Sequence, residues 1–279
     1  MKKTFLFIAI VLAFVACNKI EGPYLTQSQQ ENVDVVFPEL DHGTVYRKIL
    51  FDEYTGHHCP NCPEGHNKLN QLLTQYGDTL VAVGIHAGYF AEPDGGGLFT
   101  YDFGTETGEQ LYADFLISDN PSAIINRSGV IENNVDLWPI KLQNADRSLH
   151  AAIQIINQFD NSHNKLKINT KTTILENLSQ SVLLSLLLVE DQIVKPQENN
   201  GHVEEQYVHN HVLRAGINGT YGEYISPNGL VSKDSAYLYG YSIDFSGHDW
   251  VPENCSVIAI LLDGNSKEVL QVEKSKVKN

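Results

Sequence analysis

Two cysteines spaced three residues apart, Cys59 and Cys62, are the residues whose types and spacing most clearly predict chemistry. They can close a disulfide within one helical turn. A helix follows them, because apolar residues recur at i, i+3, i+4 and i+7 from Leu69 to Tyr76. The positive end of that helix and its free backbone N–H groups would stabilise the thiolate of Cys59 once the pair is reduced. The pattern therefore predicts a dithiol at a helix start.

The segments on either side of the pair predict a strand, a helix and a second strand. An apolar-rich run from Val45 to Phe51 precedes the cysteines, and Gly77 and Asp78 end the helix. The continuous apolar run from Leu80 to Ile85 is typical of a strand buried in a parallel sheet. A CxxC at the first turn of such a βαβ unit is stronger evidence for redox chemistry than a CxxC alone.

Residues 88–107 form a long loop that contains three consecutive glycines and several aromatic side chains. This loop is longer than a simple connection requires, and we expect it to cover a site. Asn120 and Pro121 then precede a short apolar strand. Apolar spacing between Leu149 and Ile156 predicts one more helix.

The pattern changes near residue 160, where we place a boundary between domains at 43–160 and 161–279. Short segments with alternating or continuous apolar character follow, separated by Asn, Gly and Ser turns. They predict an all-β sandwich of immunoglobulin-like type. The strand candidates are 166–174, 182–189, 237–243, 257–262 and 268–272.

The first 16 residues predict a signal peptide. Lys2 and Lys3 precede an apolar run, Thr4 to Ala16, that is too short to span a bilayer. A small residue directly before Cys17 resembles a bacterial lipobox, so we expect cleavage there and lipidation of Cys17. An ordinary secretory signal with a chance cysteine is the alternative. Residues 17–42 then form the lipidated N-terminus and a linker.

The chain is strongly acidic, with 19 Lys and Arg against 34 Asp and Glu. Removal of the first 16 residues takes away two lysines and shifts the formal charge from −15 to −17. Such a charge excludes nucleic acid as a partner and disfavours an anionic membrane surface, so the lipid at Cys17 is the expected membrane contact. The sequence carries no nucleotide-binding signature, and we expect no cofactor.

Residues 45–160 resemble a thioredoxin-like domain in the order of their predicted elements and in the position of the CxxC. In such domains a cis-proline lies beside the dithiol, and Pro121 matches it. Glu53 stands six residues before the first cysteine, where thioredoxins hold a buried acid. The resemblance implies that Cys59 attacks, Cys62 resolves, Glu53 accepts the proton of Cys62, and Pro121 shapes the substrate groove.

A narrower resemblance covers essentially the whole chain. A lipoprotein signal, the segment Tyr54–Pro63 (YTGHHCPNCP) and the segment Tyr207–Arg214 (YVHNHVLR) together are similar to the outer membrane protein 28 family of Gram-negative bacteria. The resemblance implies a lipid-anchored outer-membrane protein on the periplasmic or the cell-surface face, suggested to act as an adhesin or receptor. It supplies no proven catalytic residues.

A metal site is an alternative interpretation of the cysteine motif. The soft and borderline ligands His58, Cys59, Cys62 and His66 fall within nine residues and would suit copper or zinc. A second CxxC that would complete a structural zinc site is missing from the sequence. His209 and His211 alternate on a predicted strand, so their side chains would share one face. We expect this face to be a packed interface between domains rather than a metal site or a pH sensor.

Two hypotheses of function follow. In the first, Cys59 and Cys62 exchange disulfides with the thiols of a protein substrate in an oxidising compartment. In the second, the chain is a surface adhesin or receptor for a host surface protein, and the disulfide is a structural staple. Cys255 is left single and is expected to be a buried, inert thiol.

Overall fold

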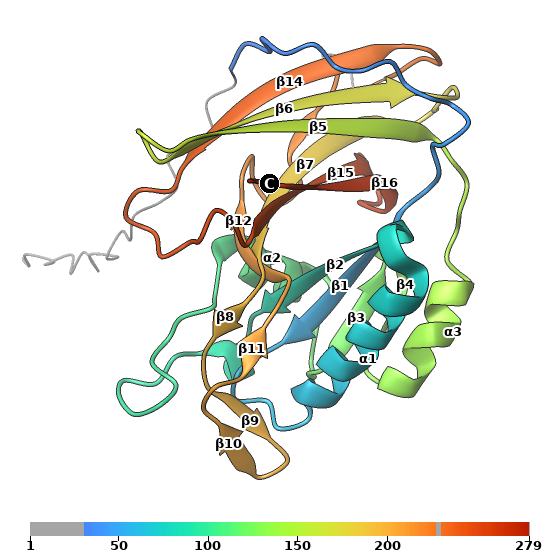
Figure 1. Cartoon of the computed structure of the whole chain (residues 1–279). Coiled ribbons are helices and arrows are strands. Elements are labelled where there is room, and N and C mark those ends of the chain that lie inside the picture. Colours follow the sequence, from blue (N-terminus) through green and yellow to red (C-terminus); the bar gives the residue numbers. More distant parts are fainter. Residues whose placement is uncertain (1–30, 227–229, 279) are drawn as a thin grey trace, which may run out of the picture.

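The computed structural model describes residues 31–226 and 230–278 as a β-rich fold with few helices. The expected signal peptide, 1–16, and the expected lipidation site, Cys17, lie outside the described residues. Figure 1 shows two layers of strands in one part of the molecule and a sheet flanked by helices in the other. Within the described ranges, no helix is both long and apolar enough to cross a membrane.

The predicted strand, helix, strand unit is formed by β1 (Ile49–Thr55), α1 (Cys62–Tyr76) and β2 (Leu80–His86). The two strands pair in parallel and are buried along their entire length. The first strand begins later than the apolar run suggested and continues to Thr55. This extension places Glu53 inside the sheet rather than at a solvated strand end.

The chain then adds short elements on both sides of this unit, and β3 (Ser122–Ile125) pairs antiparallel with β1. The peptide bond between Asn120 and Pro121, directly before β3, is cis. The added elements are η1 (Gly77–Thr79), η2 (Tyr89–Ala91), α2 (Glu106–Asp114), β3 (Ser122–Ile125), β4 (Ser128–Glu132), η3 (Val135–Leu137) and α3 (Trp138–Gln143).

The helix expected at 149–156 is wrong, because the chain forms strand β5 (Ala151–Asp160) there. Three of its ten residues are isoleucine, a β-branched residue that favours strands. The strand pairs antiparallel with β6 (Lys165–Ile174) over its full length. With β14 (Ala236–Asp244) on the other side of β6, these strands make a three-stranded sheet.

A second, nine-stranded mixed sheet runs through both halves of the chain. The halves meet where β12 (Val212–Gly216) pairs in parallel with β2, with Val212 opposite Gly84. The order is β16-β15-β7-β12-β2-β1-β3-β4, and β13 also pairs with β7. The new strands are β7 (Val182–Glu190), β12 (Val212–Gly216), β13 (Glu223–Tyr224), β15 (Cys255–Asp263) and β16 (Val269–Lys276). The finer division into a thioredoxin-like domain and a sandwich stays a prediction.

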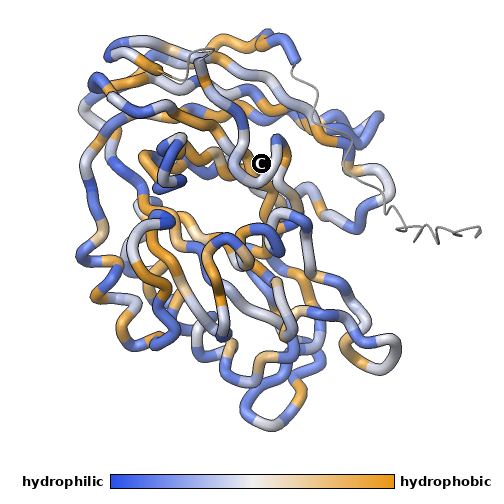
Figure 2. The backbone as a smooth tube through the Cα atoms, turned by 180° about the vertical axis from the view of Figure 1, so that it is seen from behind, coloured by the Kyte–Doolittle hydropathy of each residue, from blue (hydrophilic) through white to orange (hydrophobic). Residues whose placement is uncertain are grey.

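The apolar core follows this arrangement. One cluster lies between the three-stranded sheet and the β7, β15 and β16 part of the long sheet. A second cluster joins the halves, since it combines Leu50 and Val83 with Leu187 and Ile258. In Figure 2 the apolar stretches gather in the inner strands and the polar stretches in the peripheral loops.

Between β7 and β12 the chain leaves the sheet and forms two small hairpins. The stem pairs β8 (Ile193–Val194) with β11 (Val208–His209), and the tip pairs β9 (Gln197–Asn199) with β10 (His202–Glu204). Asn200 and Gly201 make the turn with φ of 49° and 87°. Figure 1 shows both hairpins extending past the end of β1 toward the start of α1.

The shared sheet and shared apolar cluster predict that the two halves unfold together. The chain has two tryptophans, and the structure places Trp138 in the first half and Trp250 in the second. Variants that keep only one of them, Trp250→Phe and Trp138→Phe, should show fluorescence transitions in urea that coincide with the loss of far-UV circular dichroism in the same variant. A tryptophan signal that moves separately from the circular dichroism would mean that the halves unfold independently.

Candidate functional site

Cys59 and Cys62 form a disulfide at the N-terminal end of α1. Their Cα atoms are 5.4 Å apart, and the N–H of Cys62 donates to the carbonyl of Cys59 at 3.3 Å. The two cysteines are 1% and 0% exposed. The pair therefore occupies the helix start that its spacing predicts, but the sulfur atoms are covered by the rest of the protein.

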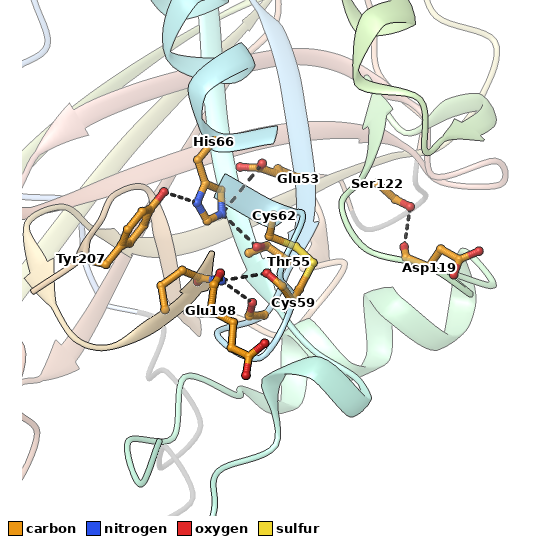
Figure 3. The surroundings of a disulfide bond; sticks show 11 residues. Glu53, Thr55, Cys59, Cys62, His66, Asp119, Ser122, Glu198 and Tyr207 are labelled. Atoms are coloured by element: carbon orange, nitrogen blue, oxygen red, sulfur yellow. Dashed lines mark hydrogen bonds and ion pairs between the residues drawn. A yellow bond between two sulfur atoms is a disulfide. The ribbon is translucent and has the colours of Figure 1, made fainter. Parts of the chain in front are cut away.

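Glu53 lies in the middle of β1 near this disulfide (Figure 3). Its side chain is almost fully buried, and Oε1 finds no hydrogen-bond partner within residues 31–226 and 230–278. Burial penalises the charged form and raises the pKa of this carboxyl to about 8. The carboxyl is therefore protonated at neutral pH.

His66, one turn into α1, lies between Glu53 and the hairpin stem. Its Nδ1 is 2.6 Å from the hydroxyl of Tyr207, and its Nε2 is 2.9 Å from the hydroxyl of Thr55 (Figure 3). Nε2 is also 4.0 Å from Glu53 Oε1. Burial lowers the pKa of His66 to about 4, so at neutral pH the acid and the imidazole are both uncharged and form no ion pair.

The metal ligand set considered from the sequence does not come together as a donor group. Cys59 and Cys62 are bonded to each other and offer no thiolate. Both ring nitrogens of His66 face hydroxyl groups, and Nε2 of His58 is 3.5 Å from Asp94. In the part of the chain that the structure describes, no group of three or more His, Cys, Asp and Glu side chains has a geometry suited to a metal ion.

Gly65 joins α1 to the acid and to the proline. A Cβ at this position would lie 2.9 Å from Glu53 Oε1, 2.9 Å from Pro121 Cβ and 2.9 Å from the ring of Trp138. The missing side chain lets the helix approach both residues closely. Figure 3 draws Asp119 and Ser122, the neighbours of the Asn120–Pro121 dipeptide, in the surroundings of the disulfide. The sequence-predicted residues Glu53 and Pro121 thus both lie against α1.

The tip hairpin covers the main chain of the CxxC loop from one side. The side-chain amide of Gln197 donates to the carbonyls of Gly56 at 3.2 Å and Cys59 at 3.0 Å. The N–H of Glu198 donates to the carbonyl of His57 at 2.8 Å, and that of Asn200 to the carbonyl of Pro60 at 3.0 Å. Three donor groups of one short segment thus engage four carbonyls next to the disulfide.

The long loop predicted to cover a site lies against the same turn. The N–H of His58 donates to the carbonyl of Phe90 at 3.0 Å. The ring of Phe99 stacks on His57, with centroids 5.4 Å apart, and lies 4.4 Å from His58. The tip hairpin and the loop at 88–107 therefore both contact the CxxC loop. The sequence predicted only the contact of the loop at 88–107.

A group of buried histidines lies under the hairpin stem. His86, at the end of β2, has its ring 5.4 Å from that of His209 and 4.4 Å from that of Phe103. Among the described residues, neither ring nitrogen of His86 has a hydrogen-bond partner. Burial lowers the pKa of His86 well below its usual value and that of His209 to about 3, so both are neutral.

The shared face expected for His209 and His211 is wrong. β11 ends at His209, and His211 has a φ of 58°, which breaks the alternation of the strand. His209 is buried against His86, whereas Nδ1 of His211 lies 2.9 Å from a carboxylate oxygen of Asp191.

Cys255 is buried and unbonded within the described chain, and burial raises the pKa of its thiol.

Comparison with known families gives one match. The family model described as "Outer membrane protein Omp28" matches residues 108–279. No curated protein matches the chain.

Several solved structures resemble this one. HBP35 of Porphyromonas gingivalis is 11% identical, with a TM-score of 0.65 over 84% of this chain and 76% of its own. A protein of Agrobacterium tumefaciens is 12% identical, with a TM-score of 0.50 over 85% and 97% of the two chains. A domain of the outer membrane lipoprotein Omp28 from Porphyromonas gingivalis is 28% identical, with a TM-score of 0.32 over 47% and 89%. The first of these shows that the fold is shared.

Replacing Glu53 with Gln should remove one pH dependence of stability. The raised pKa means that the folded protein keeps a proton which the unfolded chain loses above about pH 4.5. The free energy of unfolding of the wild type should fall, relative to Glu53→Gln, by roughly 1.4 kcal/mol per pH unit from about pH 5 to 8. Urea titrations along this range measure the difference, with Glu64→Gln at an exposed position of α1 as the control. A constant difference would show that the folded carboxyl is not buried in this way.

Gly65→Ala should destabilise the protein although alanine favours helices. The added Cβ meets Glu53, Pro121 and Trp138 at 2.9 Å. Overpacking of this kind costs about 1–3 kcal/mol, more than the gain of about 1 kcal/mol from helix propensity. Thermal and urea unfolding measure the effect. In the described structure no atom beyond its chain neighbours lies within 4 Å of a Cβ at Gly96, so Gly96→Ala is the control. A stabilised Gly65→Ala variant would contradict the close approach.

Proposed function

Because the chain belongs to the Omp28 family of outer membrane proteins, we propose that it is an outer-membrane lipoprotein, anchored by lipid at Cys17, that exchanges disulfides with other proteins. In this proposal residues 43–160 belong to a thioredoxin-like domain and residues 161–279 to a sandwich, except that β5 (Ala151–Asp160) joins the sandwich because it pairs with β6 along its full length. The parallel pair β1 and β2, the disulfide at the start of α1 and the cis bond before β3 support the first assignment.

The observation that carries the proposal is the carboxyl of Glu53. A disulfide that only staples a loop needs no acid beside it, and burying a carboxyl without a hydrogen-bond partner costs free energy. Glu53 is held in this condition next to the disulfide and is protonated at neutral pH. Such a group is suited to give a proton to a leaving thiolate and to take it back.

The exchange would proceed in two displacements. A thiolate of the substrate attacks Sγ of Cys59, the bond between Cys59 and Cys62 breaks, and Cys62 leaves as a thiolate that takes the proton of Glu53. A second substrate thiolate then attacks the substrate sulfur of the mixed disulfide and releases Cys59 as a thiolate. The substrate loses two electrons and the cysteine pair gains them, and Glu53 recovers a proton from water. The reverse sequence reduces a substrate disulfide.

A second function is favoured by the burial of the sulfurs. With Cys59 and Cys62 only 1% and 0% exposed, the disulfide can equally act as a staple that fixes the start of α1. The chain would then serve as an adhesin or receptor for a host surface protein, and binding would use another face. The two functions differ in whether the cysteines turn over.

Turnover is tested by trapping. In Cys62→Ser the remaining Cys59 thiol has no resolving partner, so it should form a stable mixed disulfide with insulin that mass spectrometry detects. The wild type should catalyse insulin reduction by a small dithiol, and Glu53→Gln should lower that rate about 100-fold.

The matched control is Cys255→Ser, which removes a buried thiol outside this site and should leave the rate unchanged. If Cys62→Ser forms no mixed disulfide and the wild type does not catalyse insulin reduction, the exchange function is overturned and the disulfide has a structural role.

A further inference from the structure

The tip hairpin lies against the CxxC loop and donates hydrogen bonds to its main-chain carbonyls. Glu198 and Asn200 lie two residues apart and turn their N–H groups toward the carbonyls of His57 and Pro60. Glu198 lies in β9, whereas Asn200 lies in the turn of the hairpin with a φ of 49°, so the two main-chain donors come from a strand and from the turn that follows it. The amide of Gln197, which is fully buried, donates hydrogen bonds to the carbonyls of Gly56 and Cys59.

The rest of the hairpin has few anchors. Asn200, Gly201, His202 and Glu204 are exposed, and so are Glu205 and Gln206, which lead back to the stem. The turn at Asn200 and Gly201 lets β9 and β10 pair with each other. Its hold on the CxxC loop therefore depends mainly on Gln197 and the two main-chain donors.

We propose that the carbonyl strip of Gly56, His57, Cys59 and Pro60 is a docking surface for a short segment of a partner polypeptide that turns as the hairpin does, and that the hairpin Gln197–Glu204 is its internal occupant. This inference rests on the proposed exchange function, because it explains how a buried disulfide meets a protein substrate. The partner supplies main-chain N–H groups and a carboxamide side chain, Asn or Gln, in place of those of the hairpin. The hairpin leaves before the sulfurs become reachable.

The complementarity of donors and acceptors supports this choice of occupant. The strip offers only carbonyl oxygens, so it selects N–H donors and has no use for an acceptor such as a carboxylate. Main-chain N–H groups in a strand and in a tight turn, together with a side-chain carboxamide, supply such donors. The chain's own Gln197–Asn200 segment demonstrates the fit within this fold.

Access to the disulfide is tested by its rate of reduction with a small phosphine, which needs no exchange partner. Gln197→Ala removes the buried amide and should speed reduction about tenfold. Gln206→Ala is the matched control, since within the described residues this exposed amide hydrogen-bonds only to the neighbouring carbonyl of Glu205. Phe99→Ala loosens the long loop from His57 and His58 and should have a smaller effect. An unchanged rate in Gln197→Ala, or a larger effect of Phe99→Ala, would overturn the hairpin as the cover.

The docking surface is tested by binding of a labelled peptide with the sequence of residues 195–206. It should bind Gln197→Ala at least tenfold more tightly than the wild type, in which the hairpin competes. A peptide N-methylated at the positions of Glu198 and Asn200 lacks the two donors and should not bind. Equal binding of the two peptides, or no binding of either, would overturn the docking surface.

These outcomes are separable from the exchange function. Peptide binding and phosphine reduction of Gln197→Ala involve no turnover, so they can succeed when insulin reduction fails. In that case the strip and its cover are supported and the exchange function is not. If insulin reduction succeeds while Gln197→Ala behaves as the wild type in both assays, exchange stands and the hairpin inference falls.

Discussion

The pairing of β12 with β2 determines where the rest of the structure lies. The N–H of Gly84 donates to the carbonyl of His211 at 2.7 Å, and a Cβ on Gly84 would lie only 3.4 Å from the carbonyl oxygen of Asn210. This contact joins the C-terminal strands to the strand next to β1. It also fixes the chain that precedes β12 at the end of β1 where the disulfide lies. Without it, the hairpins between β7 and β12 would have no reason to meet the CxxC loop.

A consequence of this closure is a pocket in which ionisable groups are held uncharged. Glu53, His66, His86 and His209 line one small cavity between α1, the ends of β1 and β2, and the hairpin stem. Burial raises the pKa of the acid to about 8 and lowers that of His66 to about 4. Neutral groups avoid most of the cost of burying charge. Any motion that admits water to this cavity would change all of these protonation states together.

The sequence predicts those features that are encoded locally. Continuous apolar runs identify β1 and β2, and the CxxC spacing identifies the helix start. The helix expected at 149–156 fails because apolar residues in a short run match helical spacing by chance, while the isoleucines of β5 find a partner in β6. Gln197 is out of reach for such reasoning, since its contact with Cys59 spans 138 residues. Gly65, three residues after the second cysteine, is a local sequence signal for close packing of α1 against its neighbours.

The same burial that makes the disulfide look structural also makes a reactive disulfide useful. A pair open to solvent would react with every small thiol in an extracytoplasmic compartment, whereas one under a hairpin held by a few hydrogen bonds reacts only with a partner that replaces them. A structural disulfide and a disulfide that exchanges with a substrate would therefore look the same in a structure where the hairpin covers the cysteines. The two differ in the free energy needed to move the hairpin off the CxxC loop and in the presence of a proton donor beside the disulfide. In the proposed exchange Glu53 would be that donor, and a structural disulfide has no need of it.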